Sequence, residues 1–424
     1  MEAKPMIALY GEQTRLTLEN MSFSGVRLAE FPSYLTALAQ VKKACAIANH
    51  RAGLLDDEKK EAICQACDEL LQHDYSEQFP VDAFHGGGGI GTNMNMNEVI
   101  AGLAGHGVQS VDDVNMSQST SDVCHTALRL CLSREAGSLV KVIGPLIRTA
   151  EEKSEAFHPH PTIARTCWQD GMSVPADAVL KGFADALSEQ LELLEDYKDT
   201  LCKVNLGWTV IGSGTGASDG YRRHIMEALR EVTEHPFSWK KSAYQAAQYT
   251  EDLSVLSVYI RIISSILAKF ARDIRLLASG PETGLGEWRI PAVQAGSSFF
   301  PGKVNPVIAE MVIQCDMLIG GNDSVIQNVL AQGEVHLNVW EDMAGFLLVQ
   351  NIMRLSKAAD LFHRNCVSGL ELNVETGVGY SRASIPLIVR YKEKYGYKKL
   401  AVQVKKYGFE ETVLRIRKGE LDQP

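Results

Sequence analysis

The sequence predicts a mostly α-helical protein built around a bundle of long helices. Apolar residues recur every three or four positions over residues 176–204, which is the pattern of one buried helical face. A second stretch, residues 252–278, is apolar around most of its circumference. Patterns typical of β-strands are sparse. The second stretch must therefore be covered on several sides, either inside a large bundle or against other subunits.

The long helices are expected in the middle of the chain. Pro175 stands just ahead of the 176–204 stretch, where a proline suits a first helical turn. Two further helices are expected at about 305–330 and 339–365, and short breaks between them favour antiparallel neighbours. Chemistry is expected in the Gly-rich or turn-rich loops. These loops cover residues 85–92, 207–216, 279–287 and 295–302.

Composition and charge argue against two classes of function, nucleic-acid binding and a role in the membrane. The formal net charge of -10 argues against non-specific nucleic-acid binding, which needs a basic surface, although a local cationic pocket could still hold a small anion. No stretch reaches the roughly 18 uninterrupted apolar residues of a membrane span, and the first residues lack a signal-peptide pattern. We therefore expect a cytoplasmic protein that acts on no membrane.

The number and spacing of the cysteines also favour a cytoplasmic protein. Nine scattered cysteines, an odd number, are typical of reduced thiols rather than of a disulfide framework. Cys64 and Cys67 form a CxxC pair, but the pair lies in a helical stretch with no second pair to complete a zinc site. We interpret the pair as structural and predict no metal site.

A glycine-rich motif runs over residues 85–98 (HGGGGIGTNMNMNE). Consecutive glycines let backbone amides approach an anion, but the lysine and hydroxyl of a nucleotide phosphate loop are missing. Thr92 and Asn95 offer neutral groups that suit a carboxylate or a tightly packed helix start. Taken alone, a structural turn is the simpler explanation.

Two more polar motifs precede helical stretches. Residues 115–122 (NMSQSTSD) contain the hydroxyls of Ser119, Thr120 and Ser121 directly before an apolar helix. This is the pattern of a helix N-cap, and a helix N-terminus also binds anions, so both interpretations can hold. Residues 165–170 (RTCWQD) stand shortly before the helix that begins near 176.

The fourth motif, residues 296–306 (GSSFFPGKVNP), is the most informative. Within one Gly/Pro-bounded loop, Ser297 and Ser298 supply a candidate base and a hydrogen-bond donor. Lys303 and Asn305 could clamp a carboxylate. A structural turn has no need for a lysine and an asparagine on either side of a single valine.

The fourth motif resembles the GSSxMPxKxN signature of the fumarase/aspartase superfamily. Other segments resemble the aspartase branch in the same chain order: YGEQT at 10–14, QFPVD at 78–82, NMNMNEVI at 93–100, NMSQST at 115–120, GSGTG at 212–216 and LNV at 337–339. The resemblance covers nearly the whole chain.

This resemblance implies a fold and an assembly. It implies three mostly helical domains, at residues 1–114, 115–366 and 367–424, with the central long-helix bundle shared in a homotetramer. Each active site would then form where three chains meet. The family uses no organic cofactor, although some aspartases respond to divalent metal ions. The expected partner is a small dicarboxylate substrate.

The resemblance also implies roles for single residues. Ser297 would be the base that removes a proton next to a carboxylate, giving an aci-carboxylate intermediate. The residues that match carboxylate-binding positions are Ser119, Thr120, Ser298, Lys303 and Asn305. Thr166 and Glu310 also match site positions, and for Glu310 the alternative is an ordinary charge on a helix surface.

Three positions depart from the aspartase pattern. Cys167 replaces a histidine, Ser121 replaces the asparagine that contacts the amino group, and Ile90 replaces a hydroxyl residue. Cysteine cannot act as a charged donor in place of imidazole, and serine lacks an amide carbonyl that could accept from an ammonium. The dicarboxylate clamp is therefore retained while the contacts to the leaving group are altered.

The leading hypothesis is a carbon–nitrogen lyase that converts aspartate, or an aspartate analogue, into fumarate or a substituted fumarate. One alternative is a fumarase-type hydro-lyase. A second alternative, from another functional class, is a catalytically silent relative with a structural role. The retained Ser297, Lys303 and Asn305 disfavour the silent relative.

Overall fold

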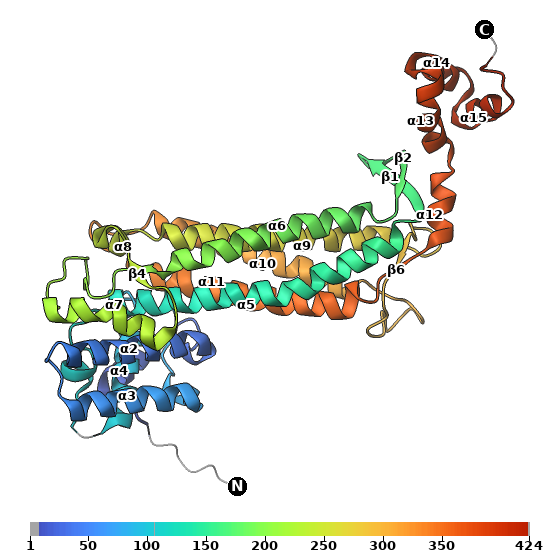
Figure 1. Cartoon of the computed structure of the whole chain (residues 1–424). Helices are drawn as coiled ribbons and strands as arrows, with labels where there is room; N and C mark the ends of the chain where they lie inside the picture. The colour runs from blue at the N-terminus through green and yellow to red at the C-terminus, as the bar shows by residue number, and fades with distance from the viewer. Residues whose placement is uncertain (1–7, 106, 423–424) are drawn as a thin grey trace. The chain divides into compact units, whose positions relative to one another are not determined.

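Helices dominate the computed structural model, which describes residues 8–105 and 107–422 (Figure 1). The helices are α1 (Glu12–Met21), α2 (Pro32–Arg51), α3 (Asp57–Gln72), α4 (Ile90–Ala104), α5 (Thr120–Phe157), α6 (Ala178–Lys198), α7 (Asp219–Thr233), α8 (Ala243–Gln248), α9 (Glu251–Leu277), α10 (Val307–Leu330), α11 (Glu341–Phe362), α12 (Val374–Ser381), α13 (Ser384–Tyr395), α14 (Tyr397–Tyr407) and α15 (Phe409–Arg417). The predicted fold class, mostly helical with long central helices, is confirmed.

Strands are short and occur in pairs. They are β1 (Pro161–Thr166), β2 (Gln169–Pro175), β3 (Lys203–Val204), β4 (Ser238–Trp239), β5 (Trp288–Arg289) and β6 (Glu371–Leu372). β1 and β2 form an antiparallel hairpin, β3 and β4 pair in parallel, and β5 and β6 pair antiparallel. The hairpin was not apparent from the residue pattern.

The long helices agree closely with the expected stretches. The 252–278 stretch is α9, and the 339–365 stretch is α11 followed by a π-helical turn, His363–Val367. The 176–204 stretch is α6 followed by a 3₁₀ turn, Asp199–Cys202. α10 begins at Val307 rather than near 305, because Pro306 disfavours a helical conformation at the residue before it.

The contacts divide the described chain into two compact units. Unit 1 comprises residues 8–140, 191–262 and 317–355, and unit 2 comprises residues 141–190, 263–316 and 356–422. Helices α5, α6, α9, α10 and α11 each contribute one segment to each unit, and within a unit these segments lie side by side (Figure 1). The three domain boundaries expected from the sequence stay a prediction.

Each unit has an aromatic core. In unit 1, Phe346 of α11 packs against Phe31 at a centroid distance of 4.7 Å and against the edge of Tyr34 at 5.0 Å. In unit 2, Phe183 of α6 stacks on Phe270 of α9 at 4.0 Å. Such aromatic pairs bury large apolar areas and hold the helices that carry the polar motifs.

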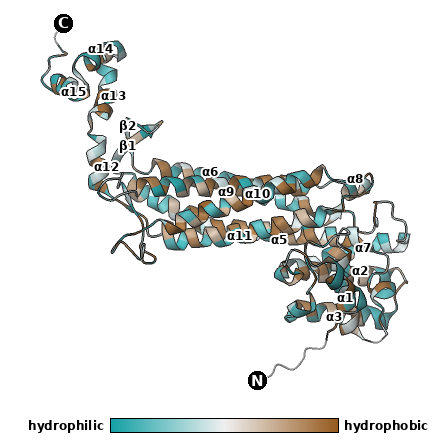
Figure 2. Cartoon of the chain, turned by 180° about the vertical axis from the view of Figure 1, so that it is seen from behind, coloured by the Kyte–Doolittle hydropathy of each residue, from teal (hydrophilic) through white to brown (hydrophobic). Residues whose placement is uncertain are grey.

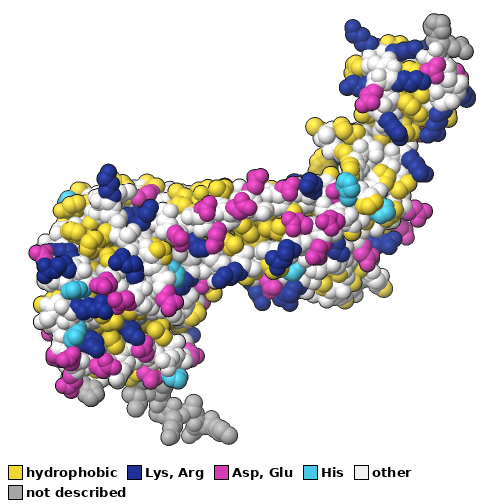
Figure 3. All heavy atoms as spheres, viewed as in Figure 1, with side chains coloured by type: hydrophobic (Ala, Val, Ile, Leu, Met, Phe, Trp, Pro, Cys, Tyr) yellow, Lys and Arg dark blue, Asp and Glu magenta, His cyan; other side chains and the backbone are white. Residues whose placement is uncertain are grey.

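The C-terminal helices α13–α15 enclose a small core of their own within unit 2. Its buried members are Ile388, Leu400, Val413, Ile416 and Leu421. Lysine and arginine side chains gather over these helices in the space-filling view (Figure 3), although the chain as a whole is acidic.

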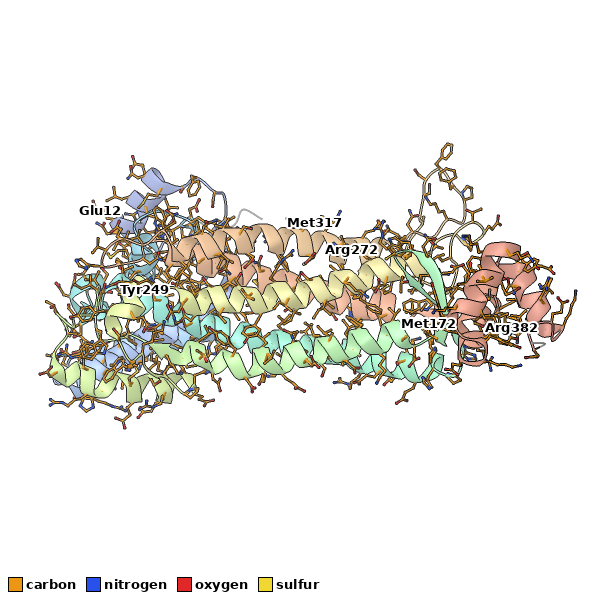
Figure 4. All side chains as sticks on the ribbon, turned by 90° about the horizontal axis from the view of Figure 1, so that it is seen from above. Glu12, Met172, Tyr249, Arg272, Met317 and Arg382 are labelled. Atoms are coloured by element: carbon orange, nitrogen blue, oxygen red, sulfur yellow. The ribbon has the colours of Figure 1, made fainter. Side chains whose placement is uncertain are left out.

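Apolar side chains also lie on the outer surface of the long helices in unit 1. On α9 these are Val255, Val258 and Ile262, and on α10 they are Met317, Leu318 and Val325. Hydropathy colouring shows how much of these helices is apolar (Figure 2), and Met317 is labelled on α10 in Figure 4. Among the described helices, α9 also has the length and composition of a membrane span, as the core helix of a soluble protein can.

Candidate active site

The glycine-rich motif forms a turn that leads directly into α4. Gly89 is the N-cap residue and has a φ of 85°, a left-handed conformation that glycine adopts without strain. Behind the turn, His85 Nε2 accepts from the backbone N–H of Thr92 at 3.0 Å, and His85 Nδ1 lies 2.7 Å from the Gly86 carbonyl oxygen. The imidazole is therefore neutral with its proton on Nδ1, and burial lowers its pKa.

Amide side chains connect α4 to the second polar motif. Asn93 Nδ2 donates to Asn115 Oδ1 and to Thr120 Oγ1, both at 3.1 Å. The fully buried Lys42 donates from Nζ to Asn115 Oδ1 at 3.0 Å and to Gln118 Oε1 at 2.9 Å. Burial lowers the pKa of Lys42 to about 8. This lysine was not among the predicted site residues, because it lies in an ordinary-looking helical stretch.

The start of α5 carries the three predicted hydroxyls. Ser119 Oγ and Ser121 Oγ lie 3.3 Å apart, and Ser121 Oγ donates to the Val210 carbonyl at 3.0 Å. Asp122 is buried and accepts from the backbone N–H of Ser119, Gly207 and Thr209. Burial raises the pKa of Asp122 to about 6, and these three hydrogen bonds oppose the rise. Residues 207–210, which precede the GSGTG segment, are thereby held next to the start of α5.

Thr92, Ser119, Thr120 and Ser121 thus lie within one hydrogen-bonded part of unit 1. Asn95 is buried, and its amide donates to the Gln78 carbonyl at 2.9 Å, so that donor is occupied by the fold. Ile90 is 43% exposed at the first turn of α4.

The RTCWQD motif forms the tip of the β1–β2 hairpin in unit 2. Cys167 and Trp168 are the two turn residues, with φ values of 52° and 61°. Two positive φ values define a type I′ turn, which normally prefers Asn and Gly. Thr166 and Cys167 are exposed at this tip, while Arg165 is anchored by the buried Glu287. Cys167, which departs from the aspartase pattern, is therefore exposed at the tip of the hairpin.

The fourth motif forms an exposed loop between β5 and α10. Ser297 Oγ accepts from the backbone N–H of Phe299 at 3.0 Å and of Phe300 at 2.9 Å. Two donors on one hydroxyl oxygen stabilise negative charge there, which is what a serine base needs. Asn305 Nδ2 donates to the Gly296 carbonyl and closes the base of the loop. A side chain on Gly296 would collide with the Lys303 carbonyl.

Cationic residues line a pocket of about 790 Å³ at the base of this loop. Its lining includes Lys303, Asn305, Glu310, Arg272, Arg275 and Arg289. Arg272 is labelled on α9 in Figure 4. Glu310 is about half-exposed and pairs with Arg275 at 3.4 Å. The pocket suits a small anion, whereas Ser297, Ser298, Thr166 and Cys167 do not line it.

A buried charge network supports the helix starts in unit 1. Arg129 of α5 donates to Asp252 at the start of α9 and to Glu341 at the start of α11. His125 Nδ1 lies 3.0 Å from Glu341 Oε2. Burial would raise the pKa of Asp252, but Arg129 and Lys240 outweigh it and bring the pKa to about 2. Carboxylates at helix N-termini are also favoured by the helix dipole.

A family model for lyases matches residues 3–321 of this chain. The chain belongs to the fumarase/aspartase family of lyases. The predicted family is therefore confirmed, and the lyase's polar motifs are placed on the helix starts and loops described above.

Two curated relatives illustrate the similarity of this lyase to aspartate ammonia-lyases. The aspartate ammonia-lyase of Helicobacter pylori is 36% identical over 406 residues, covering 93% of this chain and 87% of that protein. The enzyme of the same name from Corynebacterium glutamicum is 37% identical over 401 residues, covering 91% of this chain and 75% of that protein.

Solved structures of two family members match the lyase closely. A Brucella melitensis protein described as a fumarate lyase:delta crystallin, bound to cobalt, matches with a TM-score of 0.92 and 36% identity, covering 97% of this chain and 93% of that one. A class II fumarase from Schistosoma mansoni matches with a TM-score of 0.92 and 26% identity, covering 98% and 93%. In residues 8–105 and 107–422 we find no group of three or more His, Cys, Asp or Glu side chains able to hold a metal ion.

Proposed function

We propose that this lyase removes an amine from aspartate or an aspartate-like dicarboxylate and releases fumarate or a substituted fumarate. The observation that carries this proposal is the hydroxyl oxygen of Ser297, which accepts two backbone N–H groups in a loop followed by Lys303 and Asn305. The similarity to aspartate ammonia-lyases supports an amine as the leaving group.

In the proposed mechanism, the Ser297 alkoxide takes the proton from the carbon next to a substrate carboxylate. The electron pair moves into that carboxylate and forms an aci-carboxylate. This species then reforms the carboxylate as the carbon–carbon double bond forms and the carbon–nitrogen bond breaks. The protonated amino group leaves as a neutral amine with the bonding pair, and this amine takes up the proton that Ser297 removed, which restores the alkoxide. Stabilising the doubly charged carboxylate is the largest demand of this reaction, and hydroxyl and cationic donors meet it.

The carboxylates of the substrate would be held by two groups of residues. Thr120 and Ser119, at the start of α5, would hold one carboxylate with the help of the helix N-terminus. Lys303, at the cationic pocket, would hold the other. These two groups belong to units 1 and 2, and we propose that a homotetramer assembles the complete site from several chains. We also propose a cytoplasmic location, which nine free cysteines support.

A fumarase-type hydro-lyase is the second candidate. It is favoured by the match to a class II fumarase structure and by Ser121, whose neutral hydroxyl suits a neutral leaving group. The two candidates differ in the nucleophile of the reverse reaction.

The test is to mix the purified protein with fumarate and, separately, with ammonia, with a panel of amines and with water alone. Loss of fumarate absorbance is followed in each mixture. Consumption that needs an amine or ammonia supports the proposal and identifies the leaving group. Consumption in water alone, with formation of malate, would establish the hydro-lyase instead. No consumption under any condition would favour a silent relative.

A further inference from the structure

Asp342 is a buried carboxyl group without a partner. It lies in the first turn of α11, and its side chain is only 8% exposed. Neither of its carboxyl oxygens has a hydrogen-bond partner within the part of the chain that the structure describes. A buried polar group without a partner costs free energy, and a bound ligand that supplies the missing hydrogen bond is one explanation for its presence.

This carboxyl faces the glycine turn of the candidate active site. A side chain on Gly89 would collide with Oδ2 of Asp342, and the same Cβ would lie 3.5 Å from the Thr120 methyl group. The absence of a side chain on Gly89 therefore lets the Asp342 carboxyl pack directly against the glycine turn, near the Thr120 side chain. Val339, in the LNV segment just before α11, lies beside the neighbouring Gly88.

The groups around Asp342 leave its charge uncompensated. Tyr34 of α2 and Cys124 of α5 face it, and neither carries positive charge. The neighbouring Glu341 is already paired with Arg129. Burial, and next the charge of Glu341, raises the pKa of Asp342 to about 7. A cation that contacts the Asp342 carboxyl would favour its ionised form.

We propose that Asp342 is the acceptor for the protonated amine of the substrate. This inference rests on the proposed function and names a specificity-determining residue for it. Ser121 and Cys167 lack the amide acceptor and the imidazole of the aspartase pattern, and a carboxylate beside Thr120 supplies a stronger acceptor for a cation. The site therefore selects dicarboxylates that carry a protonated amino or substituted amino group over those that carry a neutral one.

The experiment measures ligand binding by calorimetry in a Ser297→Ala background, which prevents turnover. The ligands are L-aspartate, N-methyl-L-aspartate and succinate, which has the same carboxylates and no amine. Asp342→Asn keeps the shape of the side chain and removes its charge. Asp323→Asn is the matched control, because Asp323 belongs to the same unit and accepts from Ser257 and Gln327 away from the glycine turn.

We expect Asp342→Asn to weaken binding of the amine ligands about ten- to a hundred-fold, the range of a charged hydrogen bond, and to leave succinate within about two-fold. Asp323→Asn should change neither. Equal affinities of Asp342→Asn and its parent for every ligand would overturn the inference. If the parent still binds succinate in that case, the proposed function is not contradicted. If the parent binds succinate and neither amine, the inference also fails. If it binds no ligand at all, both the inference and the proposed function fail.

A second measurement does not need the Asp342→Asn variant and therefore tests the inference even if that variant fails to fold. In the Ser297→Ala parent, affinity for the amine ligands should fall as the pH drops below about 7, where Asp342 takes up a proton. The affinity for succinate should not follow this curve. Parallel pH dependence for succinate and the amines would contradict a role for Asp342 in amine recognition.

Discussion

At the scale of single residues, Ser297 carries the proposed chemistry. Its hydroxyl oxygen is held by two backbone donors from the same loop, so the charge of an alkoxide would be stabilised without a neighbouring histidine. Replacing Ser297 with alanine removes the base and leaves those backbone groups free to bind water on the exposed loop. We expect turnover to fall about a hundred- to ten-thousand-fold with an unchanged circular dichroism spectrum. Turnover close to that of the parent would exclude this serine as the base.

Asp342 should also affect stability through its proton. The folded chain holds this proton up to about pH 7, whereas an unfolded aspartate releases it near pH 3.8. The stabilisation that this proton gives the folded chain is therefore fully present below the pKa of the unfolded state. It is lost as the pH rises through 7. At about 1.4 kcal/mol per pKa unit, the loss is on the order of a few kcal/mol.

Asp342→Asn cannot ionise and should not show this loss. Melting temperatures measured from pH 4 to 8 should fall with pH more steeply for the parent than for the variant. Parallel curves for the two proteins would mean that Asp342 ionises freely in the folded chain.

The departures at Cys167 and Ser121 should tune the preference for the leaving group. If they are specialisations away from free ammonia, the parent protein should deaminate aspartate poorly. The double change Cys167→His and Ser121→Asn should raise that activity several-fold and lower activity on the native amine, because a site built for one polar group discriminates against others. Ile90 is unchanged in this variant and provides no hydroxyl, which limits the gain in aspartate deamination. Efficient aspartate deamination by the unmodified protein would make these positions neutral.

At the scale of elements, α10 presents an apolar surface that the chain itself leaves uncovered. Met317 is 65% exposed and Leu318 is 57% exposed. Burying such a surface against other chains is favourable by roughly 25 cal/mol per Å². We expect Met317→Glu with Leu318→Glu to shift the protein to smaller species in sedimentation velocity experiments.

The matched control for this shift is Val402→Glu on α14. Val402 is 63% exposed, so one glutamate enters a surface of similar exposure on a different helix. Its sedimentation should equal that of the parent. If the α10 variant sediments like the parent, this face of α10 is not a subunit interface.

At the scale of the whole molecule, the proposed tetramer requires sites assembled from several chains. Ser297 lies in unit 2 and Thr120 in unit 1. Mixing inactive Ser297→Ala chains with inactive Thr120→Val chains should restore part of the activity, because some sites in hybrid tetramers receive an unaltered copy of each motif. Mixtures that stay inactive after confirmed subunit exchange would indicate sites contained within one chain.

The bundle and its principal helices were predictable from residue pattern, because a helix buried along one face repeats its apolar residues every three or four positions. The β1–β2 hairpin was not. Its turn is Cys167-Trp168 rather than the Asn-Gly that signals a type I′ turn, so the sequence carries no local signal for the hairpin. The 38-residue length of α5 was missed too, since Pro145 lies within it, and proline normally suggests a helix boundary.

The sequence by itself determined the helical fold class, the family and the motif that contains Ser297, because local periodicity and short ordered motifs are properties of neighbouring residues. Only the tertiary structure decided which distant groups meet. It placed Lys42 against Asn115 and Asp342 against the Gly89 turn. From the sequence pattern, Lys42 was only a lysine within a helix and Asp342 only an acidic residue at a helix start. The raised pKa of Asp342 and the lowered pKa of Lys42 likewise arise from burial, which depends on packing between elements far apart in the chain.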